Sequence, residues 1–211
     1  MPQTKAATRR KTPVKPRKAT RDLLLDTAGL LLGEVGVERI STNLICERAG
    51  VTPPALYYYF ADKFDVIVAL GERLMDRQND ALVRWIEQNA GGGIEAYANS
   101  AEDLLRVTAE ITDAEPGGVW IERALHASPR LEHVRIESHR FVTGLLTDAF
   151  GAHLPAVPRE RIWLRARMLV EYGYMALEML NAESAISRDT ILAEAARLQR
   201  MAILDLADGA S

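Results

Sequence analysis

The sequence has a single cysteine and few aromatic residues. Among 211 residues, Cys46 is the only cysteine, and Phe, Trp and Tyr together account for 6%. One cysteine excludes an internal disulfide framework and is typical of a protein in a reducing compartment. We interpret Cys46 as a small hydrophobic side chain that fills an alanine-sized core site, and a redox switch there is the less favoured alternative.

Long apolar runs and strand-like alternation are also missing. The chain is 48% hydrophobic, which is enough to bury a core, but its uninterrupted apolar runs extend over only a few residues. We therefore expect no membrane-spanning segment and no signal peptide, and predict a cytoplasmic protein without a membrane partner. Because no useful length alternates with period two, the sequence predicts an all-α fold without a sheet.

The sequence lacks the common motifs of enzymes. It contains no GxSxG, HExxH, P-loop or dinucleotide-binding fingerprint. His126, His133, His139 and His153 are seven, six and fourteen residues apart, whereas neighbours on one helix face lie three or four apart. The sequence thus predicts no enzyme, no cofactor and no metal site, and we expect the histidines at the surface or in pocket walls.

Basic charge is concentrated at the N-terminus. Residues 1–21 hold eight of the 26 Lys and Arg residues and no acid, while the rest of the chain combines 18 basic with all 29 acidic residues. Such a segment is normally a solvated arm, and its side chains gain affinity for DNA by releasing counterions from phosphates. We predict a flexible basic arm at 1–19 that contacts DNA together with Arg21, in part through Arg17 and Lys18.

The pattern of residues 41–60 is that of two short helices joined by a tight turn. Gly50 permits the positive φ of the turn, and Thr52 or Pro53 caps the second helix. At least one of the three tyrosines that follow Leu56 must face outward. This layout is typical of a helix-turn-helix, whose second helix enters the major groove, and an ordinary helical hairpin with exposed tyrosines is the alternative.

Residues 20–67 resemble the DNA-binding domain of the TetR family of bacterial transcriptional regulators. The resemblance rests on an ordered series: Thr20-Arg21, Ala28, Gly36, Thr42, Ile45, Ala49-Gly50-Val51-Thr52, Leu56-Tyr57, Tyr59-Phe60 and Asp62-Lys63. Three positions depart from the family pattern, since Cys46, Leu32 and Pro54 stand where alanine, phenylalanine and glycine are common. None of them introduces a buried charge, so they affect the details of base reading more than the fold.

The resemblance assigns DNA contacts to matching positions. Tyr57, Lys63 and Thr42 are expected to hold backbone phosphates, and the residues expected at the bases are Asn43, Thr52, Pro53, Pro54, Ala55 and Tyr58, with Tyr59 beside them. The recognition helix has no Arg, Lys, Asn or Gln for a bidentate base contact. We therefore hypothesise that Ala55, the prolines and Tyr58 read thymine methyl groups, while Asn43 contacts adenine.

Helix breakers divide the rest of the chain. We expect a first helix from Thr20 to about Val35, a long helix from Asp62 to about Asn89, and five more at about 94–112, 118–127, 129–150, 158–181 and 187–207. The predicted domains are a basic arm at 1–19, a three-helix DNA-binding domain at 20–66, and a helical effector-binding and dimerisation domain at 67–211.

The last two predicted helices are apolar on several sides, which indicates burial on several sides. Family members pair these helices with a second copy, so the resemblance implies a homodimer, and a monomer core is the alternative. Residues expected to line a pocket for a hydrophobic ligand are Tyr97, Leu104, Trp120, Phe141, Met168, Tyr172 and Met175. Glu171 and Glu178 either line this pocket or pair with arginines such as Arg123, Arg140 or Arg167.

Together these features predict a sequence-specific transcriptional regulator. By resemblance, it is expected to be a repressor that binds a palindromic operator in double-stranded DNA and is released by a small, hydrophobic effector. A ligand-independent DNA-binding activator or DNA-organising protein is the alternative. An enzyme or interaction module with a vestigial DNA-binding head is a third possibility.

Overall fold

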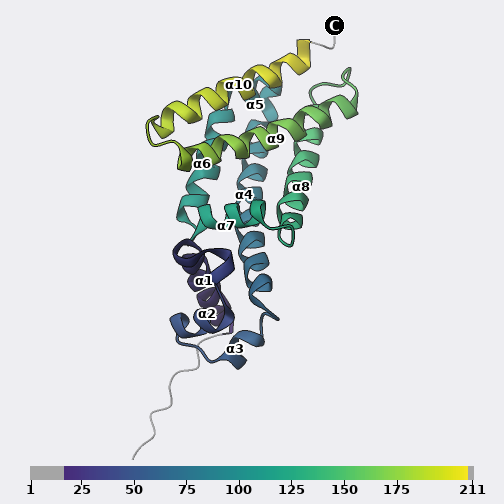
Figure 1. Cartoon of the computed structure of the whole chain (residues 1–211). Coiled ribbons are helices and arrows are strands. Elements are labelled where there is room, and N and C mark those ends of the chain that lie inside the picture. The colour runs from purple at the N-terminus through teal and green to yellow at the C-terminus, as the bar shows by residue number, and fades with distance from the viewer. Residues whose placement is uncertain (1–16, 209–211) are drawn as a thin grey trace, which may run out of the picture.

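The computed structural model describes residues 17–208, and every regular element in this range is a helix (Figure 1). The predicted all-α fold is therefore confirmed. The helices are α1 (Arg17–Arg39), α2 (Thr42–Ala49), α3 (Pro53–Tyr57), α4 (Lys63–Asn89), the short 3-10 helix η1 (Ala90–Gly92), α5 (Gly93–Asn99), α6 (Ala101–Ala114), α7 (Gly118–Ala127), α8 (Glu132–Gly151), α9 (Arg159–Ala182) and α10 (Arg188–Asp208). Most of the predicted basic arm, residues 1–16, lies outside the described range.

The helices form two regions, which Figure 1 shows at opposite ends of the molecule. Helices α1, α2 and α3 pack together as the head, and α5 to α10 form the body. The long helix α4 contacts α1 in the head and α6 and α8 in the body, so it connects the two regions. Within residues 17–208, no helix combines the length and the apolar character that crossing a membrane requires.

Local signals determine the turn between α2 and α3. Ser41 caps α2 by accepting a hydrogen bond from the Leu44 backbone N–H at 3.2 Å, and Gly50 follows the last residue of α2 with φ at 66°. Thr52, in an extended conformation, is the N-cap residue of α3, and prolines occupy the first two positions of that helix. A missing N–H is tolerated there because helix N-termini leave these donors without intrahelical partners. The structure thus contains the predicted helix-turn-helix.

The ends of two head helices differ from the predicted ones. Helix α1 begins at Arg17 rather than Thr20, so residues 17–19 of the predicted arm are helical. Gly36 interrupts α1 with φ at 74°, and one further turn continues to Arg39. Helix α3 ends at Tyr57, and the two following tyrosines form a turn. A glycine accepts the positive φ at the α1 break without the steric strain that a side chain would add.

The N-terminus of α4 carries a reciprocal cap. Asp62 Oδ1 accepts hydrogen bonds from the backbone N–H groups of Phe64 at 2.7 Å and Asp65 at 3.0 Å. Asp65 Oδ2 in turn accepts one from the Ala61 N–H at 2.9 Å. Such a pair of bonds satisfies N–H groups on both sides of the helix start. It therefore fixes where the head ends and α4 begins.

The prediction of a single helix at 94–112 is wrong, because two helices, α5 and α6, meet at Ser100. The Ser100 hydroxyl donates to the Ala96 carbonyl at 2.8 Å and contacts Asn89 Oδ1 at 3.0 Å. The Ser100 carbonyl accepts a hydrogen bond from Trp85 Nε1 at 3.0 Å. Serine side chains that bond to nearby backbone compete with helix geometry. No glycine or proline stands at this point, so the break has no strong local signal in the sequence.

A buried ion-pair cluster connects head and body. The Glu115 side chain, which follows α6, is fully buried and pairs with Arg73 and Arg77 of α4. Arg73 also pairs with Asp26 of α1 at 2.9 Å. One carboxylate therefore holds α4 against the corner between α6 and α7, and one guanidinium links that corner to the head.

The corner between α6 and α7 also touches α1 through backbone atoms. A Cβ atom on Gly29 would lie 2.0 Å from the Pro116 carbonyl oxygen, and one on Gly117 would lie 1.9 Å from the Gly29 carbonyl oxygen. Close by, a Cβ on Gly33 would lie 2.9 Å from the Trp120 ring. Because only glycine allows such an approach, these positions bring α1 and α7 into direct contact.

Candidate DNA-binding surface and body cavity

Helix α3 lies at the end of the head opposite the body (Figure 1), and it ends at Tyr57, with Tyr58 directly after it. Tyr57 is 53% exposed and Tyr58 is 65% exposed. The Tyr57 hydroxyl lies 3.1 Å from Thr42 Oγ1 on α2, so these two predicted phosphate ligands are neighbours. The ring of Tyr58 meets that of Tyr59 edge-on, with centroids 4.8 Å apart. The turn thus displays two hydroxyl groups that can reach a phosphate backbone and one large ring beside them.

The remaining predicted base contacts surround these tyrosines. Asn43, Thr52, Pro53 and Pro54 are exposed, and Ala55 is half-buried. Helix α3 contributes no Arg, Lys, Asn or Gln to this surface, so Asn43 of α2 is the one predicted base contact with a bidentate side chain. Apolar atoms of prolines, alanine and tyrosine are groups that contact thymine methyls.

Three predicted DNA contacts have packing roles in the structure. Lys63 Nζ donates to the carbonyl oxygens of Val37 at 2.9 Å and Glu38 at 3.1 Å, near the end of α1. An ammonium has three N–H donors, so one remains for a phosphate. Tyr59 is half-buried against the head core, and the Arg21 guanidinium lies 5.6 Å from the centre of the Phe60 ring. The side chains of Arg17 and Lys18 are outside the described part of the chain.

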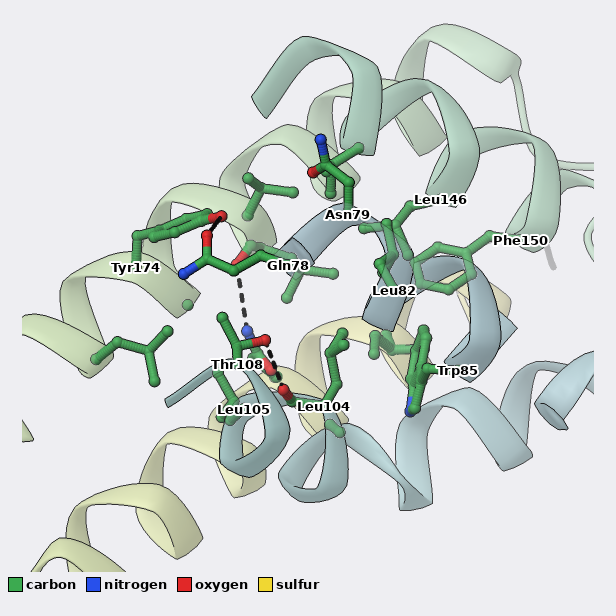
Figure 2. Close-up of a pocket in the computed structure, with 18 residues that line it drawn as sticks. Gln78, Asn79, Leu82, Trp85, Leu104, Leu105, Thr108, Leu146, Phe150 and Tyr174 are labelled. Carbon is green, nitrogen blue, oxygen red and sulfur yellow. Dashed lines mark hydrogen bonds between the residues drawn. The ribbon is translucent and has the colours of Figure 1, made fainter. Parts of the chain in front are cut away.

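An apolar cavity lies in the body beside α4 (Figure 2). Figure 2 shows Leu82, Trp85, Leu146 and Phe150 on one side and Gln78 with Tyr174 on the other. The free volume is about 80 Å³ for the centre of a water-sized sphere, several times the ~10–15 Å³ that one water needs by that measure. The lining comes from α4, α6, α8, α9 and α10.

Only one of the seven predicted ligand-binding residues lines this cavity. Leu104 is part of the cavity wall. Tyr97 is nearly fully buried but does not line the cavity; its ring packs against Trp85 and Phe150, which do. The other five do not line the cavity: Tyr172 is half-buried, and Trp120, Phe141, Met168 and Met175 are between 45% and 61% exposed. Periodicity identified the apolar faces of these helices but not which face meets the interior of the body.

Gln78 joins four helices at the polar end of the cavity. Its side chain is 3% exposed, and Nε2 donates to Thr112 Oγ1 at 2.9 Å and to Glu122 Oε1 at 3.0 Å. Its Oε1 accepts a hydrogen bond from the Tyr174 hydroxyl at 2.8 Å. Burial raises the pKa of the Glu122 carboxyl, although the two donors act against that rise. Gln78 therefore links α4 to α6, α7 and α9.

His139 is buried, so the prediction that it lies at the surface or in a pocket wall is wrong. Its side chain is fully buried, stacks on the Tyr174 ring at 4.2 Å, and contacts Glu171 Oε1 through Nδ1 at 2.9 Å. Burial lowers the pKa of His139 to about 4, although the Glu171 carboxylate opposes that shift. Because the neutral imidazole must donate to the carboxylate, Nδ1 carries the hydrogen.

The two glutamates of α9 have different roles. Glu171 pairs with His139, with Arg167 at 2.5 Å and with Arg135 at 3.5 Å, so the ion-pair alternative holds for it. Burial acts to raise the pKa of Glu171, but His139 and the two guanidinium groups together lower it. Glu178 is exposed and borders a small hollow beside Arg123 instead of the cavity.

Sequence reasoning missed Gln78 and Gln199, the two buried amides of the cavity. A usable signal exists, because each occupies a core position on an otherwise apolar stripe. Gln78 lies four residues from both Leu74 and Leu82, and Gln199 lies four from both Ala195 and Ile203. A polar residue at such a position must find a buried partner. Among the described residues, no group of three or more His, Cys, Asp or Glu side chains could hold a metal ion.

Sequence comparison relates the head and, more weakly, the whole chain to known regulators. The family model described as bacterial regulatory proteins, tetR family, matches residues 24–70. The chain is similar to the tetracycline repressor protein class C of Escherichia coli, with 40% identity over 58 residues that cover 28% of this chain and 26% of that repressor. It is also similar to the HTH-type transcriptional regulator BetI of Rhizobium meliloti (strain 1021), with 26% identity over 182 residues that cover 82% and 85% of the two chains.

Structural comparison extends the likeness of fold beyond the head. The crystal structure of a TetR-family transcriptional regulator from Syntrophomonas wolfei matches with a TM-score of 0.73 at 15% sequence identity. The match covers 90% of this chain and 97% of that one. The match with the tetracycline repressor spans only about a quarter of its length, whereas this fold match includes head and body together. Residues 24–70 therefore match the TetR family of bacterial regulatory proteins, and head and body together share the fold of the Syntrophomonas wolfei regulator.

Proposed function

We propose that this protein is a sequence-specific, DNA-binding repressor of transcription. The observation that carries the proposal is the exposed surface of α2 and α3, where Tyr57, Thr42 and Tyr58 gather at the end of the head. Large aromatic side chains held more than half exposed on a capped helix pair are well suited to a ligand surface. Hydroxyl donors position a protein on phosphates, and the ring with its neighbouring prolines meets the bases.

A second copy of the chain provides the two-fold symmetry that a palindromic operator requires. Large apolar side chains lie exposed along the outer faces of α9 and α10: Leu164, Met168, Met175, Met179, Leu198 and Met201. On α9 these residues share one face, because their spacing brings them within a narrow arc of the helix. Gly173, by contrast, faces α10 of the same chain. This apolar face supports a homodimer formed by the last two helices.

The cavity is the effector site in this proposal because α4 forms part of its wall. Gln78, Leu82 and Trp85 of α4 line the cavity, and Arg73 lies little more than one turn before Gln78 on the same helix. A ligand that displaces α4 would alter the Arg73 contacts with Glu115 and Asp26, and with them the position of the head. Half-sites lie about one helical turn apart or a multiple of it, so a change in head separation lowers operator affinity.

A ligand-independent activator or DNA-organising protein is the second function that the head would allow. The cavity favours the effector-controlled regulator, since a body that only joined two heads would have no use for a hollow at the connecting helix. A second, wider hollow lies at the loop between α8 and α9. None of its lining residues belongs to α4, so a ligand there would not contact the helix that leads to the head. Operator affinity that does not respond to any cavity-binding molecule would support the ligand-independent alternative.

Selection from a pool of random DNA duplexes tests the proposal. The purified protein should retain a two-fold-symmetric sequence near physiological salt, and Tyr58→Ala should change the base preference within it. Retention without sequence preference that disappears with added salt would contradict the proposal, because that behaviour needs only nonspecific phosphate contacts. Light scattering on the same sample should give the mass of a dimer.

A further inference from the structure

The cavity wall contains no Asp, Glu, His, Lys or Arg side chain. Among the 18 residues that line it, twelve are apolar, one is glycine, and the remaining five are Gln78, Asn79, Thr108, Tyr174 and Gln199. Burial raises the pKa of the Tyr174 phenol, so it stays uncharged. An ion placed here would lose its hydration without meeting an opposite charge, which is strongly unfavourable. The lining therefore selects against charged ligands.

Most of the polar lining groups already have partners in the protein. Both amide hydrogens and the carbonyl oxygen of Gln78 take part in hydrogen bonds, and the Tyr174 hydroxyl donates to that oxygen. Thr108 Oγ1 donates to the Leu104 carbonyl at 2.8 Å, and Asn79 Oδ1 accepts from Ser138 Oγ at 3.0 Å. The Gln78 amide and the hydroxyl hydrogens of Tyr174 and Thr108 are therefore already used within the protein.

Gln199 of α10 has an acceptor oxygen that no described residue uses. Its side chain is 9% exposed, and Nε2 donates to the Leu169 carbonyl at 3.2 Å, while no described residue donates a hydrogen bond to its Oε1. This oxygen is not among the fully buried polar atoms that lack a partner, so it is accessible and can accept a hydrogen bond from a molecule in the cavity. Opposite it, a Cβ on Gly173 would lie 3.2 Å from Gln199 Nε2, so α9 has its smallest residue where α10 brings this amide close.

We propose that the cavity binds a small, uncharged and mainly apolar molecule whose single hydroxyl group donates a hydrogen bond to Gln199 Oε1. The apolar part lies along Leu82, Leu146 and Phe150, in a cavity with room for several water-sized groups. This inference rests on the proposed function only in taking the cavity as the effector site. It makes the linear alcohols a suitable set of test ligands.

Binding is measured on the full chain without DNA, by the fluorescence of Trp85 and by the shift in melting temperature. Trp85 lines the cavity. Replacing the other two tryptophans, Trp120→Phe and Trp163→Phe, makes Trp85 the only source of tryptophan fluorescence. The ligands are the linear alcohols from butanol to octanol, each with its methyl ether, its carboxylate and its ammonium analogue. Tetramethylammonium is added because the aromatic lining could attract a cation.

The best-fitting alcohol should bind saturably and raise the melting temperature. It should bind about 5- to 10-fold more tightly than its methyl ether, which lacks the donated hydrogen. The carboxylates and ammonium ions should bind at least ~100-fold more weakly, because they would be buried without a partner. Equal binding of alcohol and ether would overturn the role of Gln199, and binding of any charged analogue would overturn the ligand class.

Two variants and a control assign the effect to the cavity. Gln199→Met keeps the length of the side chain but removes the acceptor, so alcohol and ether should then bind equally. Leu146→Trp should fill the cavity and abolish binding of both. Gln88→Met changes an exposed glutamine on α4 and should leave the affinities unchanged. Persistence of the alcohol preference in Gln199→Met would contradict the proposal even if Leu146→Trp failed to fold.

The outcome is separable from that of the proposed function. Alcohol binding is read without DNA, whereas the operator is identified by duplex selection without ligand. If no alcohol binds while a symmetric operator is recovered, the ligand class is wrong and the DNA-binding function stands. If alcohols bind but no operator emerges, the cavity assignment survives and the regulator does not.

Discussion

The head and the body distribute their polar side chains in different ways. The head encloses an almost wholly apolar core, and its ion pair between Arg48 and Glu34 is about half exposed. The body encloses Gln78, Glu115 and His139, with further polar residues among its packed helices. An apolar core surrounded by exposed functional groups behaves as a rigid platform, whereas buried polar contacts are strong when satisfied and expensive when broken. Energetically, the body is therefore the region where a small change has a large effect.

Removing the buried carboxylate between head and body should have the largest effect. Glu115→Ala leaves Arg73, whose side chain is only 16% exposed, with Asp26 as its remaining partner. Breaking a buried pair by removing one member destabilises a protein by about 3–5 kcal/mol, and we expect the lower part of that range because Asp26 remains. Chemical denaturation monitored by circular dichroism measures the free energy of unfolding.

The exposed pair of the head is the matched control for this change. Glu34→Ala removes the partner of Arg48, where both side chains are about half exposed, and should lower the free energy of unfolding far less than Glu115→Ala does. Similar losses from Glu115→Ala and Glu34→Ala would show that the buried cluster contributes no more than a surface pair. The contrast between head and body would then be wrong.

Lowering the pH should act on the body through His139. Its pKa in the folded protein is about 4, against about 6.5 for an unperturbed histidine. Below pH 6.5 the unfolded chain binds a proton that the folded chain does not, so stability is lost as the pH falls from about 6.5 to 4. Between pH 6.5 and 4 the free energy of unfolding should therefore fall by about 2–3 kcal/mol. Urea denaturation across this range measures it.

Variants at two histidines isolate that pH dependence. His139→Gln retains an N–H that can donate to Glu171 but removes the titrating ring, so the fall in stability over this range should become shallower. His133→Gln replaces an exposed histidine of the same helix and is the matched control. An unchanged slope in His139→Gln would mean that other groups cause the acid sensitivity.

The same contrast explains which parts of the molecule could be predicted from sequence. The head depends on signals that act over a few residues, such as Ser41 at an N-cap and Gly50 at the turn, and these were identified. The cavity depends on how five helices meet, and a polar residue such as Gln199 acquires its role only from that packing. The break at Ser100 was missed because the hydroxyl that stabilises it has a partner, Asn89, eleven residues away.

Adding one methyl group at the junction should have an intermediate effect. Gly29→Ala would place Cβ 2.0 Å from the Pro116 carbonyl oxygen, so α1 and α7 must separate. Overpacking of this kind typically lowers stability by about 1–3 kcal/mol. The matched change, Gly144→Ala in α8, meets no atom within 4 Å and should raise stability by up to about 1 kcal/mol, since alanine favours helix. Thermal melts of both variants should therefore shift in opposite directions, and shifts of the same sign would contradict the close approach.

The smallest expected effect comes from the head, where single hydroxyl groups act at an exposed surface. Tyr57→Phe removes the group that contacts Thr42 at 3.1 Å, and the loss of one exposed hydrogen bond should change the free energy of unfolding by less than about 0.5 kcal/mol. If that hydroxyl holds a phosphate, DNA affinity should fall by about 3- to 10-fold, and by the same factor for the selected operator and for random DNA. Fluorescence anisotropy with labelled duplexes of both kinds measures this ratio.

The neighbouring tyrosine supplies the opposite expectation. Tyr58→Ala removes a ring that is 65% exposed and should reduce operator affinity more than random-DNA affinity, because a base contact carries sequence information and a phosphate contact does not. Tyr57 would then position the protein on the DNA backbone, and its neighbour Tyr58 would provide sequence specificity. If Tyr57→Phe lowered the ratio of operator to random-DNA affinity and Tyr58→Ala did not, the two roles would have to be exchanged, and α3 would enter the groove with a different face from the one proposed.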